Sequence, residues 1–145
     1  MFRIKVNLVG LLLLSALVMV TACGGAETSA PAVVIDESAP LDLGDEIDVH
    51  TVASVKDRED VYLLDVREPW EYEEAHIPGV TLLPMGNVPD NLDQIPTDKQ
   101  VIVTCRTGNR SGQIAAYLRQ NGFDNISNMS GGIVDWQAAG YPVEP

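Results

Sequence analysis

The sequence contains very little cysteine: Cys23 and Cys105 are the only two in 145 residues. Exported domains in an oxidising compartment normally use cysteines in pairs. Cys23 is expected to carry a lipid, which leaves Cys105 as the only thiol. A solitary cysteine is either a buried packing residue or a reactive group, and packing is the commoner role. The residues around Cys105 therefore decide between the two.

Basic residues are also scarce. The chain has 9 Lys and Arg against 21 Asp and Glu, which gives a net charge of −12. This imbalance argues against a nucleic-acid partner and against electrostatic attachment to anionic lipid. The acids and the two histidines show no metal-ligand spacing, so we expect neither a metal nor another cofactor. The acidic residues instead indicate a solvated, soluble surface.

No apolar run is long enough for a comfortable membrane span. The run from Val6 to Val20 has 15 residues and is interrupted by three polar or small ones, whereas a span needs about 20. Arg3 and Lys5 precede this run and make the N-terminus positive. A short positive region followed by a short apolar region is typical of a secretory signal peptide.

Small residues follow the apolar run and lead directly to Cys23. This arrangement resembles the processing site of bacterial lipoproteins, where the peptidase cuts before the cysteine and its thiol is acylated. We therefore expect residues 1–22 to be a lipoprotein signal peptide and Cys23 to be the lipid attachment site. The protein would be exported and anchored to a bacterial membrane, with its domain in the periplasm or outside the cell. Ordinary cleavage nearby, with Cys23 left free, is the alternative.

Residues 23–46 contain six acids, two prolines, several small residues and no base. This composition predicts a lipidated, acidic, flexible tether. The apolar cluster Val33 to Ile35 leaves open the alternative that part of the segment packs on the domain. Residues 47–145 are expected to form one domain, because they contain no internal repeat and leave no room for a second core.

The domain alternates short apolar runs with helix-patterned segments. We expect strands at 47–49, 61–66, 81–83, 101–105 and 126–129. Helices are expected at 50–56, from 68 to the break at 77–79, at 91–95, at 111–121 and at 131–139. Strands that alternate with short helices predict an α/β fold, with a small parallel sheet of about five strands and helices on both faces.

Cys105 lies where the most apolar strand ends and a polar loop leads into the helix at Ser111. In open α/β sheets, ligands bind beyond the carboxyl ends of the strands. The backbone N–H groups of a curled loop and of a helix N-terminus both point to this place. With Arg106 and Arg110 nearby, these groups favour the thiolate over the thiol. The loop therefore predicts an anion cradle around the sulfur of Cys105.

Two other loop residues permit a tight curl. Gly108 frees the backbone, and Asn109 tolerates left-handed conformations. The alternative is a plain strand-to-helix turn, with the arginines in solvent and Cys105 half buried. Two arginines, a glycine and a cysteine in one six-residue loop are hard to explain by packing alone.

Three segments of the chain resemble the signatures of the rhodanese family of sulfurtransferases. The loop Cys105 to Ser111, with the sequence CRTGNRS, is similar to the active-site loop of single-domain thiosulfate sulfurtransferases. Leu64 to Tyr72, followed by His76 to Gly79, resembles the first signature of the family. Gly131 to Trp136, followed by Gly140 to Val143, resembles the C-terminal signature. Together these segments imply a rhodanese-like fold.

The resemblance implies a ping-pong transfer of sulfur. The thiolate of Cys105 would attack the outer sulfur of thiosulfate or a similar donor, release sulfite and hold the sulfur as a persulfide. Cyanide, a dithiol or a thioredoxin-like protein would then accept this sulfur, and we expect the protein to act as a monomer. The residues predicted to bind the donor belong to the same loop; in order of preference they are Arg110 and Arg106, with Thr107, Gly108 and Asn109 beside them.

Other polar residues are expected to support the loop. Asp65 and Arg67 lie at the end of a neighbouring strand and are predicted to form an ion pair that orients the loop, with a catalytic role as the alternative; Ser111 is counted with the supporting residues. Catalysis by His76 is the alternative to a structural role in its Pro-Gly corner. The acidic run Glu68 to Glu74 is interpreted as a solvated helix face. The loop has no histidine, and a preformed thiolate needs no general base.

Two other functions fit the same residues less well. A phosphatase or an arsenate-reductase-like enzyme has a similar loop, but protein tyrosine phosphatases place five residues between cysteine and arginine. Here four residues separate Cys105 from Arg110, which predicts a smaller cradle that is matched to sulfur. A non-catalytic binding module or a sulfur carrier is the other alternative. The intact cysteine and both loop arginines argue against a degenerate domain.

Overall fold

The computed structural model describes residues 41–145. The predictions for the signal peptide, for Cys23 and for the tether up to residue 40 lie outside the described residues, as does the question of whether Val33 to Ile35 packs on the domain. Within residues 41–145, no helix combines the length and the apolar character that crossing a membrane requires.

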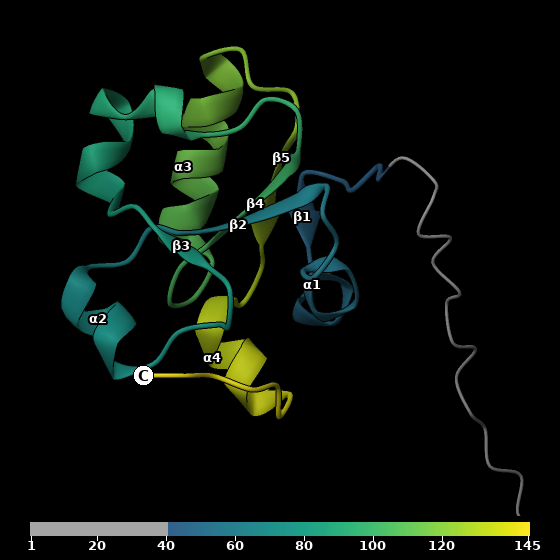
Figure 1. The fold of residues 1–145 in the computed structure, drawn as a ribbon, viewed down its shortest axis with the longest axis vertical. Helices are drawn as coiled ribbons and strands as arrows, with labels where there is room; N and C mark the ends of the chain where they lie inside the picture. Colours follow the sequence, from purple (N-terminus) through teal and green to yellow (C-terminus); the bar gives the residue numbers. More distant parts are fainter. Residues whose placement is uncertain (1–40) are drawn as a thin grey trace, which may run out of the picture. The chain divides into compact units, whose positions relative to one another are not determined.

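A sheet of five strands runs through the middle of the domain (Figure 1). Its strands are β1 (Glu46–Ile47), β2 (Val61–Asp65), β3 (Thr81–Leu82), β4 (Gln100–Thr104) and β5 (Ile126–Met129). They pair in the order β1-β5-β4-β2-β3, and every pair is parallel. The expected α/β fold with a five-stranded parallel sheet is confirmed, and β4 lies at its centre.

Helices cover both faces of the sheet. The helices are α1 (Val49–Val55), α2 (Pro69–Glu74), α3 (Asn109–Gln120) and α4 (Gly132–Ala138), and two 3-10 helices are η1 (Met85–Asp90) and η2 (Leu92–Gln94). Apolar side chains of α1 and α4 pack on one face, and those of α3 and η1 pack on the other. Because both faces are covered, β4 is apolar throughout: Ile102 points to the α1 and α4 side, and Val101 and Val103 point to the α3 side.

Most elements begin and end close to where the sequence predicted them, with two differences. The helix α3 begins at Asn109, two residues earlier than expected, because Gly108 adopts a left-handed conformation and acts as its N-cap. The 3-10 helix η1 was not expected, since Gly86 and Pro89 lie within it and are usual in loops. The early start of α3 places Arg110 in the first turn of a helix rather than in the loop.

The packed part of the chain begins before Ile47. Leu41 and Leu43 pack against the core on the α1 and α4 side. Two hydrogen bonds hold the same segment. The hydroxyl of Ser127 donates to the carbonyl of Gly44 at 2.7 Å, and the backbone N–H of Asn128 donates to the backbone carbonyl of Asp45 at 2.8 Å. The last residues of the segment interpreted as a tether are therefore part of the domain.

Candidate active site

Cys105 follows the last residue of the central strand, and its loop turns directly into α3. Gly108 closes the turn with φ +91°. A side chain at this position would also lack room, because a Cβ atom would lie 3.1 Å from the backbone nitrogen of Gly131. Both the backbone conformation and the close approach of the chain require glycine here.

The beginning of α4 holds the loop from outside. The N–H groups of Ile133 and Val134 donate to the carbonyls of Cys105 and Arg106, at 2.9 and 3.1 Å. Gly132 has φ +60°, and a Cβ atom there would lie 2.6 Å from the carbonyl oxygen of Arg106. Since a peptide N–H points opposite to its carbonyl, these contacts turn the N–H groups of the loop toward its concave side, where the sulfur lies.

The sulfur of Cys105 is buried and surrounded by hydrogen-bond donors; the residue is 1% exposed. The backbone N–H of Gly108 lies 3.2 Å from Sγ, and the hydroxyl of Ser111 lies 3.3 Å from it. Burial opposes ionisation, but the hydrogen bonds from Ser111 and from the N–H groups of Thr107 and Gly108 outweigh it, so the pKa of the Cys105 thiol is lowered. The predicted cradle is thus built mainly from backbone dipoles and one hydroxyl.

Arg110 is bound to a residue that the sequence did not single out. Its guanidinium donates to both carboxylate oxygens of Glu71, at 2.6 and 2.7 Å. Glu71 is 7% exposed, so its interpretation as part of a solvated helix face is wrong. The hydrogen bond from Arg110 lowers the pKa of the Glu71 carboxyl although burial raises it. By contrast, Arg106 is exposed at the mouth of the loop.

Asp65 and Arg67 form a second, fully buried ion pair. The two side chains are joined by hydrogen bonds of 2.6 to 3.0 Å and are 2% and 4% exposed. Arg67 also donates to the backbone carbonyls of Glu71 and Ala75 at the end of α2. Because β2 pairs with β4, Asp65 lies beside Thr104. The pair therefore ties α2, and with it Glu71, to the strand that carries the cysteine.

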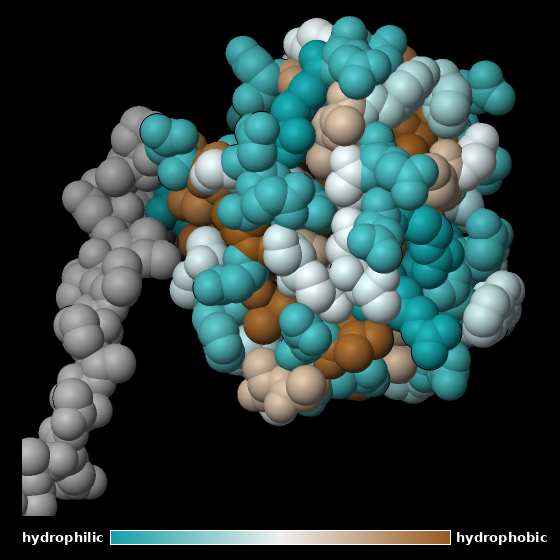
Figure 2. All heavy atoms as spheres, turned by 180° about the vertical axis from the view of Figure 1, so that it is seen from behind, coloured by the Kyte–Doolittle hydropathy of each residue, from teal (hydrophilic) through white to brown (hydrophobic). Residues whose placement is uncertain are grey.

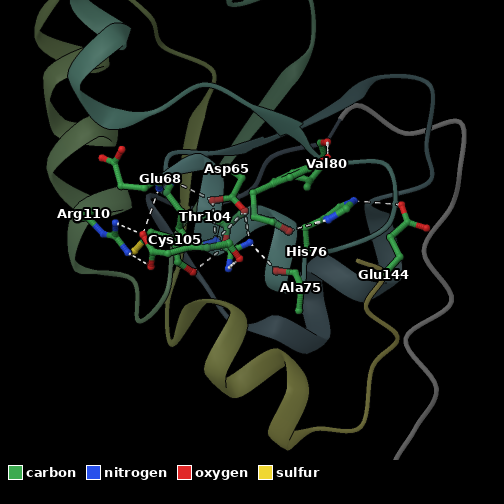
Figure 3. A network of polar contacts seen from close by, with 12 residues as sticks. Asp65, Glu68, Ala75, His76, Val80, Thr104, Cys105, Arg110 and Glu144 are labelled. Atoms are coloured by element: carbon green, nitrogen blue, oxygen red, sulfur yellow. Dashed lines mark hydrogen bonds and ion pairs between the residues drawn. The ribbon is translucent and has the colours of Figure 1, made fainter.

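These contacts belong to a continuous polar network that runs from Arg110 past Asp65 and Ala75 to His76 and Glu144 (Figure 3). His76 is buried at the end away from the loop. Its Nδ1 lies 3.0 Å from the carbonyl of Tyr72, its Nε2 lies 3.4 Å from the carboxylate of Glu144, and its ring stacks on Tyr72. The ring of His76 thus has partners at both nitrogens and holds the C-terminal segment in place.

A cavity of about 190 Å³ lies beside the loop, between α2 and α4. Trp70 and Glu74 line it from α2, Ile133 and Val134 line it from α4, and Arg106 lines it from the loop. Two positive side chains border it, but Arg67 is already paired. Arg106 is therefore the lining cation that remains available to a reactant in this cavity.

The structure brings most of the predicted site residues to the sulfur or next to it. Ser111, Thr107 and Gly108 supply hydrogen bonds to it, whereas Asn109 is exposed at the first position of α3. No sequence pattern pointed directly to Glu71 as a partner of Arg110. A local sign of a fixed role did exist, because Glu71 stands three residues after Glu68 and completes a capping box at the start of α2.

Comparison with known proteins places this geometry in a family. Residues 48–139 match the model of the rhodanese-like domain. A sulfurtransferase of Allochromatium vinosum is 40% identical over 99 residues, which cover 68% of this chain and 92% of that protein. The thiosulfate sulfurtransferase GlpE of Pseudoalteromonas translucida is 33% identical over 93 residues, 64% of this chain and 89% of that protein.

A solved structure agrees with the sequence relatives. The crystal structure of a rhodanese-related protein from Thermoplasma volcanium superposes with a TM-score of 0.65 at 31% identity, and the match covers 70% of this chain and 98% of that one. The range that matches the family model, residues 48–139, contains the cysteine loop, the Asp65–Arg67 and Glu71–Arg110 pairs and the glycines at the start of α4. The chain therefore belongs to the rhodanese-like domain family.

Proposed function

We propose that this protein is a sulfurtransferase that takes sulfane sulfur from thiosulfate or a similar donor and holds it on Cys105 as a persulfide. The observation that carries the proposal is the set of donors around Sγ: the backbone N–H of Gly108 and the hydroxyl of Ser111, at 3.2 and 3.3 Å, stabilise negative charge on a buried sulfur. A thiol that served only for packing would gain nothing from these donors. Sulfurtransferases among the relatives support the same reaction class.

The first half-reaction is a displacement at sulfur. The Cys105 thiolate attacks the outer sulfur of thiosulfate, a bond forms between the two sulfur atoms, and the bond to the sulfonate breaks with release of sulfite. The three negative charges of the reactants are kept, one on the persulfide and two on sulfite. The N–H groups that stabilise the thiolate remain in reach of the persulfide, so the loop stabilises charge before and after the step.

The structure favours a different arginine for the donor than the sequence did. Nη1 and Nη2 of Arg110 each donate to the carboxylate of Glu71, which offsets the charge of Arg110 and takes up part of its hydrogen-bonding capacity. Arg106 is exposed, lines the cavity and has no carboxylate partner within residues 41–145. We assign the sulfonate of the donor to Arg106, with Arg110 as a positioning residue that holds α2 against α3.

Mass spectrometry after incubation with thiosulfate tests the proposal directly. Cys105 should gain one sulfur, about 32 Da, as a persulfide, and the Cys105→Ala variant should gain none. Loading by a partner persulfide but not by thiosulfate or other low-molecular-mass sulfane donors would indicate a sulfur carrier instead. Turnover of a phosphate ester that is lost in Cys105→Ser would indicate a phosphatase, against which the four-residue spacing from Cys105 to Arg110 argues.

The proposal extends to where the protein works. The positive N-terminus, the short apolar run and the small residues before Cys23 support export and attachment of a lipid at that cysteine. Two or three acyl chains would hold the protein at a membrane stably, whereas one chain binds only marginally. Cys105 would then be the sole free thiol of an anchored protein outside the cytoplasm.

A further inference from the structure

The cavity beside the loop has an apolar, exposed rim. Three large hydrophobic side chains are exposed in residues 41–145, and two of them, Trp70 (63%) and Val134 (43%), line this cavity from opposite sides. Elsewhere hydrophobic residues reach the surface in small areas between hydrophilic ones, as Figure 2 shows for one face. An exposed tryptophan next to the entrance of a site is typical of a contact residue for a partner.

The α2 side of the same rim is acidic. Glu74 lines the cavity from α2, and Glu68 and Glu73 are exposed in the same segment, on either side of Trp70 in the sequence. Arg106 is the cation that faces them from the loop, because Arg67 and Arg110 are held by their own carboxylates. The chain as a whole carries a net charge of −12. The α2 side of the rim attracts cationic groups of a partner, whereas Arg106 on the loop side serves the anionic donor, and Trp70 offers a face for a cation–π contact.

The size of the cavity favours a protein over a small thiol as the sulfur acceptor. The cavity holds about 190 Å³, less than the roughly 300–1,000 Å³ of most small-molecule sites. A small thiol inside it would leave Trp70 in solvent, whereas the surface of a protein would cover both Trp70 and Val134 while it presents a thiol to the loop. The sulfur of Cys105 is recessed, so a protruding cysteine fits better than a flat surface.

We propose that the acceptor of the sulfur is a cysteine on a protein whose surface around that cysteine is apolar and basic. This inference rests on the proposed sulfurtransferase function. In the transfer, the acceptor thiolate attacks the outer sulfur of the Cys105 persulfide. The persulfide anion first takes up the proton that the acceptor thiol releases; a bond to the acceptor sulfur then forms, the bond to Cys105 breaks, and Cys105 leaves as thiolate while that proton stays on the transferred sulfur. The acidic rim selects basic acceptors over anionic thiols such as glutathione.

Two synthetic pentapeptides with capped ends probe this selectivity: Lys-Leu-Cys-Leu-Lys and Glu-Leu-Cys-Leu-Glu. The full-length protein is loaded with thiosulfate, and loss of sulfur from Cys105 and its gain by the peptide are followed by mass spectrometry. Basic flanks also lower the pKa of the peptide thiol, so each rate is divided by the rate of the same peptide with the neutral reagent dithiodipyridine. We expect the corrected rate to be about tenfold higher for the basic peptide at low salt and to converge at high salt.

Substitutions on the rim test whether the preference for the basic peptide arises there. Glu74→Gln and Trp70→Ala should each reduce the ratio between the two peptides, whereas Glu59→Gln should leave it unchanged. Glu59 is a matched control because it is also an exposed glutamate but precedes β2, at the end of the strands opposite the loop. Equal corrected rates in the unmodified protein, with the persulfide formed normally, would overturn the inference alone. Failure to form the persulfide from thiosulfate would overturn the proposed donor chemistry instead.

Discussion

The carboxylate of Glu71 and the guanidinium of Arg110 meet through two hydrogen bonds, of 2.6 and 2.7 Å, across 39 residues of sequence. This pair joins the middle of α2 to the first turn of α3. The Asp65–Arg67 pair fixes α2 to β2, so both walls of the cysteine loop depend on one another. We therefore expect Arg110 to contribute to the site mainly by holding this arrangement.

Replacing Glu71 should make the protein less sensitive to acid. Because the pKa of Glu71 is lowered in the folded state from its ordinary value of 4.5, its contribution is present above pH 4.5 and is lost as the pH falls through the lowered value. Glu71→Gln should cost roughly 1–2 kcal/mol of unfolding free energy at pH 7, a modest loss because Arg110 is 31% exposed and can be resolvated. Urea denaturation at pH 7 and at pH 3 measures both effects.

The unfolding free energies of the wild type and of Glu71→Gln should become more similar as the pH falls. At pH 3 the difference in unfolding free energy between the wild type and Glu71→Gln should be smaller than at pH 7. Glu73→Gln is the matched control, because Glu73 is exposed on the same helix. An equal difference at both pH values would mean that the Glu71 pair contributes nothing to acid stability.

The two loop arginines should behave differently. Arg106→Ala should raise the KM for thiosulfate about tenfold with little change in the melting temperature, because it removes a charge-assisted contact that only the donor needs. Arg110→Ala should lower the melting temperature and the rate of persulfide formation together, because it leaves Glu71 buried without its partner. Steady-state kinetics and thermal denaturation of both variants decide the matter; a raised KM in a stable Arg110→Ala would restore Arg110 as the donor-binding residue.

Ser111 should control the ionisation of the catalytic sulfur. Its hydroxyl lies 3.3 Å from Sγ of Cys105 and 3.1 Å from the carbonyl of Gly108; it can donate to one of them at a time, and a thiolate is the stronger acceptor. Ser111→Ala should therefore raise the pKa of Cys105. The pH profile of alkylation by iodoacetamide should shift to higher pH in this variant and stay in place in Ser54→Ala, which changes an exposed serine of α1.

The sequence could predict those parts of the site that form from residues close together in the chain. The strand that ends at Thr104 and the loop from Cys105 form from neighbouring residues, so pattern and composition predict them. The pairing of Glu71 with Arg110 depends on how α2 and α3 pack, which no local pattern encodes. Glu71 was also hidden among the acids of an exposed helix, where burial of one member cannot be read from charge alone.

Gly132 should be required mainly because a side chain at this position would collide with the cysteine loop, and not only because of its positive φ. A Cβ atom there would overlap the carbonyl oxygen of Cys105 and lie 2.6 Å from that of Arg106. Gly140 also has a positive φ, +80° against +60°, but nothing lies within 4 Å of its Cβ position. Gly140→Ala should cost only the roughly 1–2 kcal/mol of a left-handed alanine. Gly132→Ala should cost more and slow persulfide formation, as denaturation and stopped-flow kinetics would show.

Cys23 should carry the lipid anchor and take no part in the sulfur transfer at Cys105. If the sulfur of Cys23 carries acyl chains, the protein expressed in a bacterium should partition into the detergent phase and incorporate an alkyne-labelled fatty acid. Cys23→Ala should do neither, while Cys105→Ala should do both, because Cys105 is buried in the folded domain. Purified Cys23→Ala should still form the persulfide at the wild-type rate, since residues 48–139 contain the whole match to the family. A free thiol at Cys23 in protein isolated from the cell envelope would rule out the lipid anchor and leave the sulfur chemistry untouched.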